Sequence, residues 1–212
     1  SDTYVNNGLS AIPSLEALST IAQEIDLPTG WSLWSTYIDP EDSNIQTVVN
    51  EIVDDLVIVK NWSGNVYWPL FNINTIGELE KGEGYQIKMD ANRILTVSGE
   101  LIQSNFIITL PGGWFIIGYL HQNAYNAADM MAPIYTELTI LKDYLGNVYW
   151  PLFNINTILD MNPGQGYQIK TDLATNFSYP NSGRFGYQEN TNLPKTVHYD
   201  KAVNTGSNMT IA

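Results

Sequence analysis

A repeated aromatic segment has the residue types of a ligand-binding surface. Residues 64–76 read GNVYWPLFNINTI, and the same thirteen residues recur unchanged at 146–158. Strand alternation predicts that Tyr67 and Phe71 share one face. Exposed aromatic rings can stack on sugars while nearby amides, here including Gln86, bond the hydroxyls. The segment therefore predicts a carbohydrate-binding surface made of the following residues: Tyr67, Phe71, Asn72 and Asn74, with Tyr149, Phe153, Asn154 and Asn156 in the second copy.

The same aromatic residues have a second interpretation, in which they form the core of a small domain. Identity between the two copies does not decide between surface and core, because a recent duplication preserves both kinds of residue. Both interpretations therefore stay open at this point.

Residues suited to catalysis or metal binding are sparse. The two histidines, His121 and His198, are far apart in the chain. The carboxylates at 39–42 and 54–55 could bind calcium or act as an acid/base pair, but they are better interpreted as a helix-start group and a solvated helix end. Glycine pairs at 82–84 and 164–166 lead into strands, whereas phosphate loops lead into helices. We therefore predict no catalytic residue, metal ligand or cofactor, and no enzymatic activity.

An internal repeat with an offset of 82 residues organises the chain. Besides the aromatic segment, GEGYQIK matches GQGYQIK, LVIVK matches LTILK, and LPTGW matches LPGGW with the offset changed by one. Each unit is small enough to be marginally stable alone, so we expect the two to pack together. The predicted organisation is an N-terminal extension (1–26), a first unit with its linker (27–109), a second unit (110–180), and a polar tail or linker to a following domain (181–212).

Hydrophobic spacing predicts the secondary structure. A short helix is expected over 14–25, in the N-terminal extension, and the first unit then starts with a strand over 31–38. A capping box starting at Ser43 introduces a helix whose apolar stripe runs from Ile45 to Leu56, and Pro133 should shorten its counterpart. A hairpin (56–61 with 65–71) and strands at 84–89 and 94–97 follow. The predicted fold class is α+β, mainly β, with two pseudo-symmetric units of about 80 residues and one short helix in each.

Composition limits the partners. The 212 residues carry a formal net charge of −13, which disfavours nucleic acid and anionic lipid. No apolar run reaches the roughly 20 residues of a membrane helix, so we expect no membrane insertion. The chain has no cysteine and therefore no disulfide.

Several phrases together resemble a known module: GWSLWSTYI, LVIVKN, GNVYWP and GEGYQIK. They are similar to a tandem module of large secreted and cell-surface proteins of Bacteroidota, and the likeness covers about residues 27–180. The tail at 204–211 is similar to the opening of a domain that often follows. The resemblance implies export, commonly by the type IX route, and an extracellular or cell-surface location. It transfers no catalytic residue.

Two functions follow from these observations. The first is a non-catalytic structural or adhesive module of a secreted or surface protein, with other copies of itself or neighbouring domains as partners, able to assemble as a filament through the terminal strand at 208–212. The alternative is a carbohydrate-binding module that uses the repeated aromatic strand.

Overall fold

The fold consists mainly of short antiparallel strands arranged as two similar units. The computed structural model describes residues 20–181, and the predicted tail and terminal strand at 181–212 lie almost wholly outside the described residues. The predicted α+β, mainly β class is confirmed. Each unit holds one short α-helix, as expected.

The first unit contains β1 (Ile21–Leu27), β2 (Gly30–Trp34), β3 (Ile38–Pro40), α1 (Ile45–Val48), the 3-10 helix η1 (Asn50–Asp55), β4 (Leu56–Lys60), β5 (Val66–Trp68), η2 (Pro69–Phe71), β6 (Ile73–Asn74), β7 (Tyr85–Met89) and β8 (Arg93–Leu101). The second contains β9 (Ile108–Leu110), β10 (Gly113–Gly118), β11 (Tyr125–Asn126), α2 (Ala127–Met131), η3 (Ala132–Ile134), β12 (Leu138–Lys142), β13 (Val148–Trp150), η4 (Pro151–Phe153), β14 (Ile155–Asn156), β15 (Asp160–Met161), β16 (Gly166–Thr171) and β17 (Thr175–Phe177).

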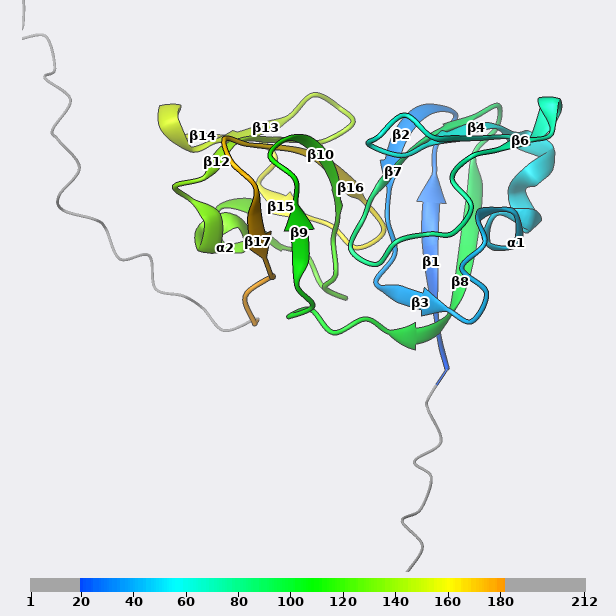
Figure 1. Ribbon diagram of the computed structural model, residues 1–212, viewed down its shortest axis with the longest axis horizontal. Helices are drawn as coiled ribbons and strands as arrows, with labels where there is room; N and C mark the ends of the chain where they lie inside the picture. The colour runs from blue at the N-terminus through cyan, green and yellow to red at the C-terminus, as the bar shows by residue number, and fades with distance from the viewer. Residues whose placement is uncertain (1–19, 182–212) are drawn as a thin grey trace, which may run out of the picture.

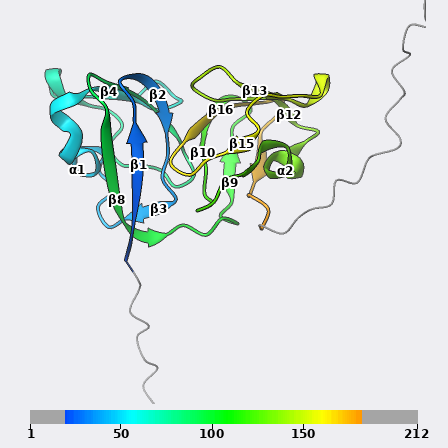
Figure 2. The same ribbon diagram turned by 180° about the vertical axis from the view of Figure 1, so that it is seen from behind.

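Each unit is built on a five-stranded antiparallel sheet. The strand orders, β2-β7-β4-β5-β6 and β10-β16-β12-β13-β14, are equivalent under the repeat. Figure 1 shows the two sheets along the top of the molecule, with the helices and the remaining strands beneath them, and Figure 2 shows the same layers from behind. A separate hydrophobic core fills the space under each sheet. The side of the two sheets that points away from the cores is called the outer face from here on.

Strand β7 shows how the sequence sets this arrangement. Tyr85, Ile87 and Met89 are buried in the first core, while Gln86 and Lys88 are partly exposed. Successive side chains of a strand point to opposite faces, so this alternation places Gln86 and Lys88 on the outer face.

The two units meet at a seam between β2 and β7 on one side and β10 and β16 on the other. The Ser35 amide donates to the Gly164 carbonyl at 3.0 Å, and the Gly118 amide donates to the Gly82 carbonyl at 2.8 Å. These two bonds are equivalent under the repeat, so the seam has approximate two-fold symmetry. The packing of the units on one another is therefore as expected.

Three glycines allow the backbones to approach this closely. A Cβ on Gly84 would lie 2.9 Å from the Ile117 carbonyl oxygen, and one on Gly166 would lie 2.8 Å from that of Trp34. A Cβ on Gly118 would lie 2.7 Å from the Glu83 oxygen. All three obstacles are main-chain atoms, so Gly118 and the second glycine of the repeated Gly-x-Gly-Tyr-Gln phrase serve the contact between units.

The helix predicted over 14–25 is wrong where the structure describes it. Residues Ile21–Leu27 form β1, which pairs along its whole length with β8. The apolar spacing of this short segment fits both helix and strand, and pairing with β8 decides for the strand. Residues 20–26, assigned to an N-terminal extension, therefore contribute to the first unit, and 14–19 lie outside the described residues.

The helix after β3 is shorter than predicted and begins differently. Asn44, rather than Ser43, is the N-cap, and its side chain accepts from the Gln46 amide. The predicted continuous helix is α1 followed by the 3-10 helix η1, although Ile45 and Ile52 are buried as expected. In the second unit α2 ends at Met131 and Pro133 lies in η3, so α2 is no shorter than α1, but the helical segment ends at Ile134 whereas that of the first unit runs to Asp55.

Candidate functional site

The two tyrosines of the predicted aromatic surface are core residues. Tyr67 is 5% exposed and Tyr149 is 7% exposed. Strand β5 ends at Trp68, and Pro69 starts a 3-10 helix, so the predicted strand over 65–71 is too long. Alternation stops at that point, and the prediction that Tyr67 and Phe71 share an exposed face is wrong.

The other residues of the predicted surface lie at the tips of the sheets. Phe71 and Phe153 are exposed and each packs edge-on against the tryptophan three residues earlier. Their neighbours shape turns, because the Asn74 side chain accepts from the Gly77 amide at 2.9 Å and Asn72 adopts a left-handed conformation.

The second copy repeats this arrangement. Asn154 is left-handed, and the Asn156 side chain accepts from the Leu159 amide at 3.0 Å. Figure 1 places the two tips, beside β6 and β14, at opposite ends of the molecule. The structure therefore does not bring the two copies together, and their binding role stays a prediction.

The candidate acid/base groups have structural partners. His121 is buried among three tyrosines, its Nε2 lies 3.0 Å from the Pro180 carbonyl oxygen, and burial lowers its pKa. Asp39 forms an ion pair with Lys81, and Asp55 with Arg93. Within residues 20–181 there is no group of three histidine or acidic side chains that could hold a metal ion. Within the same residues, no helix is long and apolar enough to cross a membrane.

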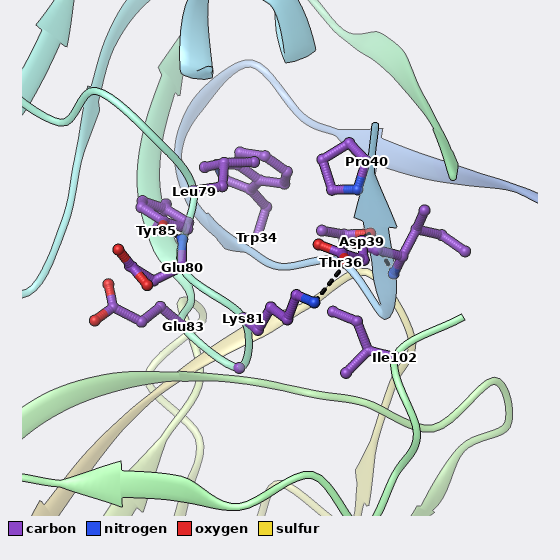
Figure 3. Close-up of a pocket in the computed structure, with 12 residues that line it drawn as sticks. Trp34, Thr36, Asp39, Pro40, Leu79, Glu80, Lys81, Glu83, Tyr85 and Ile102 are labelled. Atoms are coloured by element: carbon purple, nitrogen blue, oxygen red, sulfur yellow. Dashed lines mark hydrogen bonds and ion pairs between the residues drawn. The ribbon is translucent and has the colours of Figure 1, made fainter. Parts of the chain in front are cut away.

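A hollow beneath the first sheet is too small for an organic ligand. Figure 3 shows Lys81 reaching toward Asp39 across it, with Trp34 and Tyr85 in its wall. Its volume is about 10 Å³, which is about the space that one water occupies.

Two larger clefts open on the outer face beside the seam. The first, of about 250 Å³, is lined by Trp31, Ser32, Leu33, Lys60, Gln86 and Tyr144. The second, of about 330 Å³, is lined by Asn61, Trp62, Gln86, Trp114, Phe115, Ile116, Lys142 and Gln168. Both clefts include Gln86, so they are neighbours on one surface.

The two clefts are copies of each other under the internal repeat. Trp31 corresponds to Trp114, and Lys60 corresponds to Lys142. Tyr144, which belongs to the second unit, completes the first cleft, and its counterpart Trp62 completes the second from the first unit. Each cleft therefore needs both units, and neither exists without the seam.

The aromatic walls are partly open to solvent and held in place. Trp31 and Trp114 are 49% and 50% exposed. The Lys60 ammonium lies 5.0 Å from the centre of the Trp31 ring, and Lys142 lies 5.8 Å from that of Trp114, both at cation–π distance. Trp62 donates from its indole nitrogen to the Glu83 carboxylate at 2.9 Å, which fixes the plane of its ring.

No protein-family model, curated protein or solved structure matches this chain. Function therefore has to be argued from the chemistry of the outer face.

Positive charge gathers on this face of an acidic chain. Register places Lys88 opposite Trp31 and Lys170 opposite Trp114, on the same side of their sheets. With Lys60 and Lys142 they make four of the six basic residues within 20–181. The other two, Lys81 and Arg93, form the ion pairs found in the described part of the chain.

Part of the signal for this site is present in the sequence. Both units keep Trp, Lys and Gln at outward strand positions. Alternation alone places Trp31 and Gln86 outward. It does not say that Tyr144, from the other unit, lies beside Trp31, because that contact depends on how the units pack.

The Glu83 carboxyl lies at the seam, and we predict that its negative charge lowers the free energy of unfolding of the chain at neutral pH. Burial raises its pKa above the ordinary 4.5, the nearby Glu80 charge adds to this, and the bond from Trp62 opposes it. The folded state therefore disfavours ionised Glu83. Glu83→Gln, which copies the natural Gln165 of the second unit, should raise the free energy of unfolding at pH 7.

Urea denaturation across a pH series checks this. The difference in free energy of unfolding between Glu83→Gln and the wild type should shrink as the pH falls through the raised pKa of Glu83, because Glu83 itself then becomes neutral. Glu41→Gln, at an exposed position, controls for the change in net charge. A variant no more stable than the wild type at pH 7 would show that Glu83 is not penalised by burial.

Proposed function

We propose that this chain is a non-catalytic glycan-binding module of an extracellular adhesive protein. The pair of equivalent clefts at the seam carries the proposal. Each presents a half-exposed tryptophan, a facing aromatic ring from the other unit, a lysine and a glutamine amide.

These groups suit a sugar ring for separate physical reasons. A pyranose offers an apolar face of C–H bonds that packs on an indole, and its hydroxyls need polar partners at the edge. The Gln86 and Gln168 amides each offer donors and an acceptor there. Leu33 and Ile116 close the floor, so a bound ring is shielded from water on that side.

The extracellular setting is supported by the sequence rather than by the clefts. The repeated phrases resemble a module of secreted and surface proteins of Bacteroidota, and the resemblance implies export, commonly by the type IX route. The duplication and the strong acidic charge agree with a module that presents a binding face within a larger adhesive protein. Neighbouring domains of such a protein are then its natural partners.

Removing the cleft tryptophans should weaken glycan binding. We expect Trp31→Ala or Trp114→Ala to lower affinity for a glycan identified on a broad array by about fivefold, because stacking on an aromatic ring is worth about 1 kcal/mol and about 1.4 kcal/mol is tenfold. Isothermal titration calorimetry measures the change.

Phe71→Ala and Phe153→Ala are the matched controls, since these exposed aromatics lie at the sheet tips. They should bind like the wild type. Loss of binding in the Phe variants, with none in the Trp variants, would place the site at the tips instead. No binding to any glycan on the array would contradict the proposed function.

A second candidate function, assembly of copies end to end, is favoured by the tips themselves. Leu70 and Leu152 are each 82% exposed, next to the exposed Phe71 and Phe153. The same apolar group thus stands at both ends of the molecule. A group that can meet its own copy at two ends permits an open chain of molecules, as expected for a structural or filament-forming module.

We predict that this association is concentration-dependent and depends on the tips. Light scattering of the intact chain should show a mass that rises with concentration, and Leu70→Ser with Leu152→Ser should abolish the rise. Leu173→Ser, which alters an exposed leucine elsewhere, is the control. A constant monomer mass in the wild type would exclude assembly through the tips.

A further inference from the structure

The two clefts and a third hollow share lining residues, and together they are called the groove below. The first and second clefts share Gln86. The first also shares Tyr144 with a third hollow of about 630 Å³, which is lined by Asp26, Leu27, Pro28, Asn92, Arg93, Ile94, Tyr144 and Gln165. Three hollows joined by common side chains suit a linear ligand better than a single ring.

The lysines of the groove are placed to meet charge on such a ligand. Lys60 and Lys142 each stand over the tryptophan of their own cleft. Neither they nor Lys88 and Lys170 form an ion pair within residues 20–181. A ring stacked on Trp31 or Trp114 therefore has unpaired ammonium groups on two neighbouring strands.

We propose that the ligand is a linear oligosaccharide that carries carboxylates, as uronic acids do. The inference rests on the proposed glycan-binding function and names the ligand class of the same clefts. The sugar ring takes the place of the lysine ammonium over the tryptophan, and the displaced ammonium pairs with the carboxylate of that sugar. The repeat supplies two such subsites, one in each cleft, so that two acidic sugars of one oligosaccharide can bind at once.

The rest of the molecule limits how much charge the ligand can carry. The net charge of −13 repels a dense polyanion at long range. Near the groove, Glu83 lies beside Trp62, and Asp26 lines the third hollow next to Arg93, which is already paired with Asp55. A glycan with one carboxylate per sugar fits this field better than a DNA duplex, which carries one charge per about 1.7 Å of its length, or a heavily sulfated chain.

Methyl esters provide a direct test, because esterification removes the charge and keeps the sugar backbone. The probes are oligosaccharides of galacturonic, glucuronic and mannuronic acid, each titrated into the intact chain beside its own methyl ester. We expect at least one acid to bind about tenfold or more tightly than its ester, with the difference falling as sodium chloride is raised.

Lysine variants assign the difference to the groove. In Lys60→Gln with Lys142→Gln, the acid should bind no more tightly than the ester, so the ratio of the two affinities falls to about one. Lys81→Gln is the control, since Lys81 is paired with Asp39 elsewhere in the fold. A lysine double variant that keeps the preference for the acid would overturn the inference.

The remaining outcomes separate the two levels of the proposal. Equal binding of acid and ester, or binding of neutral glycans alone, overturns the carboxylate requirement and leaves glycan binding intact. No binding of any acidic or neutral glycan overturns both. Tighter binding of a thymidine oligonucleotide than of any acid identifies the groove as a nucleic-acid site and overturns the inference.

Discussion

Close approach of main chain to main chain at the seam is the constraint on which the rest of the structure depends. Gly84 and Gly166 face each other there, and a Cβ on Gly84 would lie 3.2 Å from the Gly166 Cα. Neither glycine needs a left-handed backbone, so the requirement is for space rather than for conformation. Because the two sheets can come this close, their outer faces join into one surface.

The seam also converts a duplicated sequence into a paired binding surface. Trp62 and Tyr144 lie in the hairpin turns of their own units, and each becomes a cleft wall only beside the other unit. The Ser35 hydroxyl strengthens this contact, donating to the Gln165 carbonyl at 2.6 Å and accepting from the Tyr119 amide at 3.0 Å. Because this buried hydroxyl both donates and accepts a hydrogen bond, it fixes how the two units align at the seam.

The sequence predicts the fold better than the site. The repeat, the β-rich class, the half-exposed strand at β7 and the early end of the second helical segment near Pro133 follow from local pattern, and local pattern is what a single sequence displays. The prediction of an N-terminal helix is wrong because the apolar spacing of so short a segment fits both a helix and a strand until its partner β8 is known. The prediction of an exposed aromatic face is wrong because a 3-10 helix starts at Pro69 and ends the alternation of the strand, and because Tyr67 is buried in the core. The clefts depend on contacts between units, which no local pattern contains.

Amide hydrogen exchange of the intact chain is the measurement that tests most directly whether the two repeats form one body. The amides of Ser35, Gly84 and Gly118 donate across the seam, to Gly164, Ile116 and Gly82 respectively. If the seam is part of the folded core, these amides exchange as slowly as those in the centre of β7. Rapid exchange at the three seam amides, with β7 still protected, would mean that the units separate freely and that the clefts are not built as described.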